Sequence, residues 1–254
     1  MNKIWFSTSG KPYNGNEPYF LSPENYEWAV KIEQNWNEIK KEIMQFIYEK
    51  DNDFTANSFF FGGKLGDSWS SIYFLNWRYN INMNNLNKHC PKLYNLLERI
   101  PGLISLSFSR LSPDTIIPIH YGDTNAVMRC HLGIEVADGL PLCGIKVGNE
   151  ARGWEEGKWL LFNDSYIHTA WNKTNKNRIV LMMDVIKPEF LNKKRFLYAY
   201  GVSRIYVYSF KLKNNLLEIR STLFDDILFT FIYPIIYVKN LLPFLNKQIW
   251  KYQS

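Results

Sequence analysis

Apolar and polar residues follow a helical period in the N-terminal part of the chain. The apolar positions recur three and four residues apart, which is the spacing of one helical face. This stripe contains Trp28, Ile32, Trp36, Ile39, Ile43 and Phe46. Ser22, Pro23 and Glu24 precede it as an N-cap residue, a proline at the first helical position and an acid in the first turn. The pattern predicts a helix that packs on a sheet.

Two further segments precede the change of pattern. A shorter helix is predicted over "CPKLYNLLERIPG", ending at Pro101-Gly102. The stretch "FFFGGKLGDS" contains glycines but lacks the Lys-Ser/Thr ending of a phosphate-binding loop and the spacing of a dinucleotide-binding motif. We therefore interpret it as a loop.

From about residue 104 the pattern becomes a series of short alternating runs, which is typical of strands. The runs are "ISLSFSRL", "TIIPIH", "AVMRCHLGIEV", "CGIKVG", "KWLLFND", "HTAWNK" and "NRIVLMMDVI". Turn-forming stretches separate them, as in "SPDT", "ADGLP", "GNEARG" and "KTNKN". Several short strands at this even spacing predict an antiparallel sandwich or barrel.

Several of these strands have one apolar and one polar face. In "AVMRCHLGIEV" the even positions from Ala126 to Val136 are all apolar, whereas Arg129 and His131 lie together on the opposite face. Ser105, Ser107 and Ser109 likewise share a face, as do Arg178 and Asp184. A solvent-exposed face would be richer in Lys, Glu and Thr, so the pattern favours a half-buried pocket for an anionic ligand.

Composition is that of one globular domain. The 254 residues are 46% hydrophobic, enough for one sizeable core. The three cysteines are odd in number and form no Cys-x-x-Cys pair, which fits a reducing compartment. The N-terminal residues lack the apolar run of a signal peptide. We therefore expect a cytoplasmic protein.

The net charge of +6 is concentrated at the C-terminal end. Residues 187–254 contain eleven Lys/Arg and four Asp/Glu, a balance of +7, while the rest of the chain has a balance of −1. The apolar run from Ile227 to Val238 is twelve residues long and contains Pro234. At ~1.5 Å per residue this run is too short to cross a bilayer. It would fit the membrane interface, and packing on the barrel or a dimer contact is the alternative.

Residues 90–190 resemble the aspartyl/asparaginyl β-hydroxylases. The resemblance includes "FSRLSPDTIIPIHYGDTNAVMRCHLGI" and "VGNEARGWEEGKWLLFNDSYIHTAWNKTNKNRIVLMMDV". It implies a mainly β, double-stranded β-helix (jelly-roll or cupin-like) fold with flanking N-terminal helices. We therefore expect an oxygenase domain over residues 1–190, with helices within 20–100 and a β-helix core over 104–187. Residues 191–254 would form a basic, aromatic extension.

The resemblance also implies an activity and a site. The family consists of dioxygenases that need iron(II), 2-oxoglutarate and O2, and that hydroxylate an unactivated C–H bond. His120 and His168 match the iron ligands. Ser109, Arg129, His131 and Arg178 match the residues that hold 2-oxoglutarate, with Arg178 expected to take the C5 carboxylate. The expected catalytic group is therefore His120, His168 and Arg178.

One position departs from the common iron site. Most such oxygenases have a carboxylate two residues after the first histidine, and Gly122 stands there instead. The family shows the same departure. Two alternatives therefore stay open: a non-catalytic β-helix binding module, and a halogenase that uses the vacant carboxylate position.

The substrate is left open by the sequence. The resemblance implies an Asp/Asn-type peptidyl substrate or the acyl chain of a membrane lipid, and no nucleic-acid partner is expected. Residues 191–254 add a possible peripheral contact with the inner face of the membrane. Neither the hydroxylated atom nor the oligomeric state follows from the sequence.

Overall fold

The computed structural model describes residues 3–9, 11–57, 65–77, 79–214 and 222–241. Part of the predicted glycine-containing loop and two parts of the C-terminal extension lie outside these residues.

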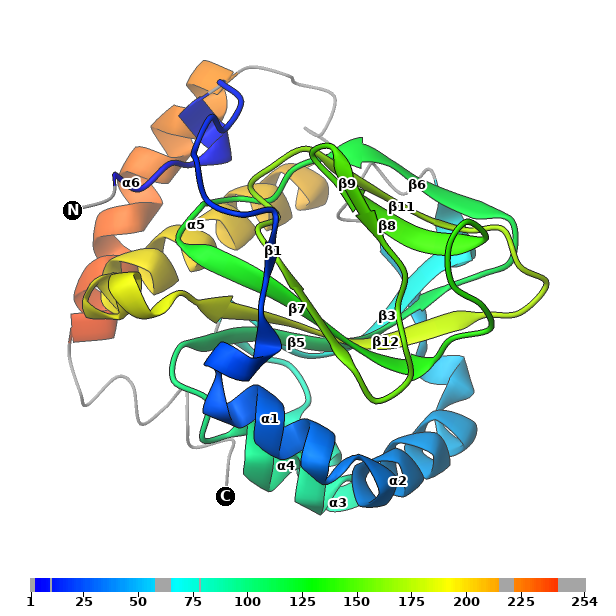
Figure 1. Ribbon diagram of the computed structural model, residues 1–254. Coiled ribbons are helices and arrows are strands. Elements are labelled where there is room, and N and C mark those ends of the chain that lie inside the picture. Colours follow the sequence, from blue (N-terminus) through cyan, green and yellow to red (C-terminus); the bar gives the residue numbers. More distant parts are fainter. Residues whose placement is uncertain (1–2, 10, 58–64, 78, 215–221, 242–254) are drawn as a thin grey trace.

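Two antiparallel sheets form the core of the described chain. The larger sheet has the order β1-β10-β7-β12-β5-β3-β2, with β4 paired to β3, and the smaller has the order β6-β11-β8-β9. The strands of the larger sheet are β1 Phe20–Leu21, β2 Thr55–Ala56, β3 Trp69–Asn76, β4 Tyr79–Asn80, β5 Leu103–Leu111, β7 Val127–Glu135, β10 Trp159–Phe162 and β12 Arg178–Ile186. Those of the smaller sheet are β6 Thr115–His120, β8 Cys143–Val147, β9 Glu150–Arg152 and β11 His168–Asn172. The two sheets face each other as a double-stranded β-helix, the predicted fold (Figure 1).

Four helices cover the outer face of the larger sheet (Figure 1). They are α1 Glu27–Gln34, α2 Trp36–Glu49, α3 Met83–His89 and α4 Pro91–Leu97. Their buried side chains, such as Ile32, Ile43 and Leu93, share one apolar core with Met128, Cys130 and other outward-facing strand residues. The predicted packing of helices on an apolar sheet face is confirmed.

The strand register confirms the predicted polar face. Asp184 is the cross-strand partner of both Arg129 and Ser105, and Met182 is the partner of both His131 and Ser107. These residues therefore form transverse rows on the side that faces the smaller sheet, because residues on one face alternate with period two. The candidate site lies between this inner face and the smaller sheet.

The predicted apolar stripe is divided between two helices. Asn35 ends α1 and precedes α2, and its side-chain amide donates to the Lys31 carbonyl at 2.8 Å. Such a side chain competes with the backbone for hydrogen bonds, which favours a helix boundary. The later helix also ends earlier than predicted, at Leu97.

Strand β3 was missed by the sequence analysis. It pairs with β5 along most of its length and is buried on both faces. Its sequence "WSSIYFLN" therefore has no alternating pattern that distinguishes it from a buried helical segment.

The described part of the C-terminal extension forms two helices, α5 Lys194–Lys213 and α6 Thr222–Leu241. Leu197, Ala199, Ser203 and Val207 of α5 are buried, and Leu197 belongs to a core cluster with barrel residues. Helix α6 packs on α5, where Phe229 contacts the ring of Tyr200. Within the described ranges, neither helix combines the length and apolarity needed to span a membrane, and no other helix does.

Candidate active site

Two of the four histidines meet between β6 and β11. His120 and His168 are cross-strand partners with ring centroids 4.1 Å apart. Their Nδ1 atoms donate to the carbonyls of Pro118, at 2.8 Å, and Tyr166, at 2.9 Å, which places each ring's lone pair on Nε2. Burial lowers the pKa of His120 to about 4 and the pKa of His168 well below its usual range. Both rings are therefore neutral at pH 7, the form that binds metals.

The Asp164 carboxylate packs against Gly122, the position at which most such oxygenases carry the third ligand. A Cβ atom added at Gly122 would lie 2.2 Å from Asp164 Oδ2. The Gly122 N–H also donates to the Asp164 carbonyl at 2.6 Å. Gly122 is thus required by close packing, and Asp164 supplies the local carboxylate from a different segment. Burial raises the pKa of Asp164 to about 7 against the opposing charge of Arg129.

Arg178 is a buried cation that has no anionic partner among the described residues. It is 2% exposed, and its Nε and Nη1 atoms make no hydrogen bond within the protein. Its guanidinium lies 4.5 Å from the centre of the Trp154 ring. Burial lowers the pKa of Arg178 to about 10, so it remains charged at neutral pH. A buried charge without a partner is costly, and a carboxylate ligand would relieve that cost.

His131 and Ser109 line the same region of the inner face. Trp154 Nε1 donates to His131 Nδ1 at 3.2 Å, which leaves a proton on the buried Nε2 atom, and Nε2 makes no hydrogen bond within the protein. Burial, together with Arg178 and Arg129, lowers the pKa of His131 well below its usual range. Ser109 Oγ accepts from Trp69 Nε1 at 3.1 Å and keeps its own proton to donate. Arg178, His131 and Ser109 thus offer donors suited to an oxyacid.

Two tryptophans that contact the residues of this site were not predicted to belong to it. Trp154 was not among the predicted site residues, yet it contacts both His131 and Arg178. Trp69 was not singled out, because it lies in the missed strand β3. Trp159, by contrast, lies in the apolar core, where it contacts Trp28 at 5.4 Å between ring centres.

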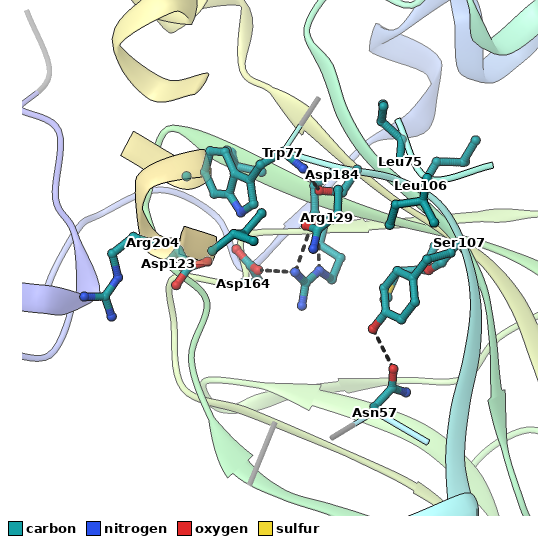
Figure 2. Close-up of a pocket in the computed structure, with 18 of the residues that line it drawn as sticks. Asn57, Leu75, Trp77, Leu106, Ser107, Asp123, Arg129, Asp164, Asp184 and Arg204 are labelled. Carbon is teal, nitrogen blue, oxygen red and sulfur yellow. Dashed lines mark hydrogen bonds and ion pairs between the residues drawn. The ribbon is translucent and has the colours of Figure 1, made fainter. Parts of the chain in front are cut away.

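Arg129, which was predicted to hold 2-oxoglutarate, contacts two carboxylates in this structure. Its Nε and Nη2 atoms donate to the two carboxylate oxygens of Asp184 at 2.8 and 3.1 Å. Nη2 also lies 3.2 Å from Asp164 Oδ2 (Figure 2). Although burial opposes its charge, the carboxylates of Asp184 and Asp164 raise the pKa of Arg129. In this structure Arg129 holds Asp164 in place beside Gly122.

A cavity of about 540 Å³ lies beside this charged network. Figure 2 shows the Asp164 carboxylate next to the guanidinium of Arg129, with Asp123 on the other side of Asp164, toward Arg204. The cavity reaches Trp77 and the helix α5 residue Arg204. Such a volume is typical of small-molecule sites.

The donor set of the site fits a metal held by two histidines. Within the described parts of the chain, no group of three or more His, Cys, Asp or Glu side chains is arranged as a metal site. The paired imidazoles, both neutral and both fixed by backbone carbonyls, are nevertheless suited to one ion. The unpaired donors of Arg178 and His131 fit a bidentate anion nearby.

The chain thus combines a cupin-like double-stranded β-helix with two buried histidines that face each other across β6 and β11. The model of the family "Aspartyl/Asparaginyl beta-hydroxylase" matches residues 33–188. The chain belongs to this family.

The names of similar proteins indicate different substrates. The "Ornithine lipid ester-linked acyl 2-hydroxylase" of Rhizobium tropici is 32% identical over 177 residues, 68% of this chain and 62% of the relative. The human "Aspartyl/asparaginyl beta-hydroxylase" is 32% identical over 195 residues, 72% of this chain and 25% of the relative. The human "Aspartate beta-hydroxylase domain-containing protein 2" is 29% identical over 197 residues, 72% of this chain and 52% of the relative. The chain thus spans less than two thirds of the length of these relatives.

Proposed function

We propose that this protein is an iron(II)- and 2-oxoglutarate-dependent hydroxylase. The observation that carries the proposal is the buried, unpaired Arg178 beside the neutral His131 on the inner face of the larger sheet, while the histidine pair belongs to the facing, smaller sheet. When bound, iron and 2-oxoglutarate supply the oxidation: one oxygen atom of O2 enters a substrate C–H bond, and 2-oxoglutarate becomes succinate and CO2.

The chain's own residues perform distinct tasks in this proposal. His120 and His168 hold the metal through Nε2, while the backbone carbonyls at Nδ1 fix both rings. Arg178 binds the distal carboxylate of the co-substrate, with donors from Ser109 and the protonated Nε2 of His131 close by. Arg129 orients Asp164, whose carboxylate can accept a hydrogen bond from water at the metal.

The same geometry weighs against the two alternatives. A non-catalytic binding module would not require neutral, paired histidines next to an unpaired buried arginine. A halogenase would need room for chloride near Gly122, and the Asp164 carboxylate already fills the space beside that glycine.

A spectroscopic experiment tests the proposal. Anaerobic iron(II) with 2-oxoglutarate should produce a visible charge-transfer band that is lost in His120→Ala and in His168→Ala. His89→Ala is the matched control, because His89 pairs with Glu49 on the helical side, and it should keep the band. A band that survives both ligand substitutions would show that the histidines are misassigned.

For the substrate we propose the acyl chain of a membrane lipid, with a peptidyl Asp/Asn as the competing candidate. Ile227, Phe231, Ile235 and Val238 form an exposed stripe on α6, each between 48% and 71% exposed. This stripe and the basic C-terminal quarter support peripheral contact with an anionic membrane at its cytoplasmic face. Phe229 is not part of the stripe, because it packs on Tyr200.

Liposome sedimentation tests the membrane contact. The protein should sediment with anionic vesicles more than with neutral ones, and high salt should release only part of it, because the apolar contribution resists salt. Phe231→Glu should weaken sedimentation. Tyr48→Glu, at an exposed aromatic of α2, should not. Equal behaviour of the two variants would remove the support for a lipid substrate.

A further inference from the structure

Each of the two paired histidines lies at the end of a strand, next to a loop. His120 is the last residue of β6, and residues 121–126 lead from it to β7. His168 is the first residue of β11, and residues 163–167 lead to it from β10. Because the two histidines are cross-strand partners, both loops leave the smaller sheet at the same end. The separation of the two imidazoles therefore depends on how these loops are held.

The N-terminal segment, meaning the described residues among 3–19, crosses the first of these loops. The backbone N–H of Ser7 donates to the Asp123 carbonyl at 2.9 Å. The backbone N–H of Trp5 donates to the side-chain Oδ1 of Asn125 at 2.7 Å. Asn125 is only 2% exposed, so this contact is shielded from water. The loop that follows the first histidine is thus bound to the segment through both backbone and side chain.

The same segment holds the second loop. Asn163 Nδ2 donates to the Pro18 carbonyl at 2.6 Å. The Tyr166 hydroxyl donates to the Glu17 carbonyl at 2.9 Å. Tyr166 is also the residue whose backbone carbonyl accepts from His168 Nδ1. The segment therefore reaches the second histidine ring through one intervening residue.

Tyr13 connects the two sets of contacts. Its hydroxyl accepts from Asn125 Nδ2 at 3.3 Å and donates to the Glu17 carboxylate. Its ring packs edge-to-face on the ring of Tyr166, with 5.1 Å between the ring centres. Burial and the Glu17 carboxylate raise the pKa of Tyr13, so its hydroxyl keeps the proton that it donates. Tyr13 thus joins the two loops. It lies before residue 33, where the family match begins.

We infer that Tyr13 is a positioning residue for the metal site: it holds the loop after His120 against the loop before His168 and thereby fixes the separation of the two imidazoles. The inference rests on the proposed function, because it takes the histidine pair to be the metal site. Groups that orient the ligands of a metal strengthen its binding without touching it. A purely structural contact would change the stability of the protein and leave its affinity for metal unchanged.

Calorimetry with cobalt(II) and the metal-free, full-length protein tests the inference without turnover. Tyr13→Phe keeps the ring on Tyr166 but removes the hydroxyl that contacts both Asn125 and Glu17. It should weaken cobalt(II) binding by about three- to tenfold. The visible absorption of the bound cobalt should also change, because the geometry of its ligands changes. Affinity and absorption equal to those of the parent would overturn the inference.

Tyr19→Phe is the matched control. The Tyr19 ring also packs on Tyr166, with 4.8 Å between the ring centres, but its hydroxyl makes no hydrogen bond with the described residues. Its affinity for cobalt(II) should equal the parent's. Ile43→Val, in the core beneath the outer helices, should lower the thermal midpoint and leave cobalt(II) binding unchanged. If either control weakened binding as much as Tyr13→Phe, the loss would reflect general destabilisation and the inference would be wrong.

Glu17→Gln tests the same contact if Tyr13→Phe does not fold. It keeps the volume of the side chain and replaces a charged acceptor by a neutral one, which weakens the hydrogen bond from Tyr13. Cobalt(II) binding should fall by about two- to threefold. In that case, parent-like affinity in Glu17→Gln would overturn the inference.

His120→Ala separates this inference from the proposed function. Cobalt(II) binding that requires His120 but is unchanged in Tyr13→Phe retains the metal site and refutes the inference. Binding that requires His120 and is weakened in Tyr13→Phe supports both. Binding that persists in His120→Ala, or no saturable binding in the parent, refutes the metal site and with it the proposed function.

Discussion

Two arginines on the inner face of the same strand pair have opposite surroundings. Arg129 donates to both oxygens of Asp184 and lies beside Asp164, whereas Arg178 is deeply buried with an aromatic ring as its main contact. A cation paired with two carboxylates contributes to the folded structure. A cation buried without a carboxylate lowers the stability of the unliganded protein and is explained by an anion that binds there. A buried charge thus indicates a binding site only when the protein itself supplies no group of opposite charge to pair with it.

The largest effect on stability is expected for Arg129→Met. Removing the guanidinium leaves two buried carboxylates uncompensated, so the free energy of unfolding should fall by ~3–5 kcal/mol in urea denaturation. Arg110→Met is the matched control, because Arg110 pairs with the exposed Asp51, and it should cost about 1 kcal/mol or less. Equal losses in the two variants would mean that Arg129 is not a structural cation.

Arg178→Met is expected to weaken 2-oxoglutarate binding without lowering the stability of the protein. Binding of 2-oxoglutarate, measured by calorimetry with the metal-loaded protein, should weaken by about 100-fold, because a charge-assisted contact is lost. The free energy of unfolding without ligand should stay equal or rise, since an unpaired buried charge is removed. Arg152→Met is the control: Arg152 also lies over a ring, that of Phe20, but is exposed and paired with Glu150. Normal 2-oxoglutarate binding in Arg178→Met would contradict the co-substrate assignment.

For these two arginines, the sequence predicted the face of the strand but not the partners of the side chain. Alternation placed Arg129, His131, Arg178 and Asp184 on one face, because the side-chain period of a strand is fixed by its backbone. It did not reveal that Asp184 is opposite Arg129, because strand order and register depend on long-range pairing. Asp164 was not among the predicted site residues for the same reason: its contact with Arg129 joins segments 35 residues apart in sequence.

Helices and strands were likewise predicted only where the sequence has a local period. Helices α1, α2 and α4 and most strands from β5 onward were predicted, because each carries a clear local period, whereas α3, α5, α6 and the short strand β9, which lies in the predicted turn "GNEARG", were not. Strand β3 has no such period, since both of its faces are buried, and it was therefore missed together with Trp69. The ends of helices α1 and α4 differ from the prediction, because local side-chain hydrogen bonds and turns determine where a helix ends.

A smaller effect is expected at Gly122, which packs against the Asp164 carboxylate. Gly122→Asp should lower both the charge-transfer band and the thermal stability, because the new Cβ would collide with the Asp164 carboxylate. Overpacking of this kind costs ~1–3 kcal/mol. Gly122→Ala should lower stability less, as it adds no second carboxylate.

A double variant sharpens the Gly122 prediction. Gly122→Asp combined with Asp164→Gly moves the carboxylate from one segment to the other and relieves the collision. It should regain part of the stability lost in Gly122→Asp. A single Gly122→Asp variant with full stability and activity would show that the close packing with Asp164 has no consequence.

The smallest effect is expected at Trp154, which joins the two donors of the Arg178 region. Trp154→Phe keeps a ring beneath the guanidinium but removes the indole N–H that fixes the tautomer of His131. A neutral hydrogen bond is worth ~0.5–1.5 kcal/mol, so 2-oxoglutarate binding should weaken by only about two- to twelvefold. Trp159→Phe is the matched control, because the buried Nε1 of Trp159 makes no hydrogen bond within the protein, and its affinity for 2-oxoglutarate should not change. If both variants bind 2-oxoglutarate as the parent does, the Nε2 proton of His131 is not a donor to the co-substrate, and Arg178 alone carries the anion.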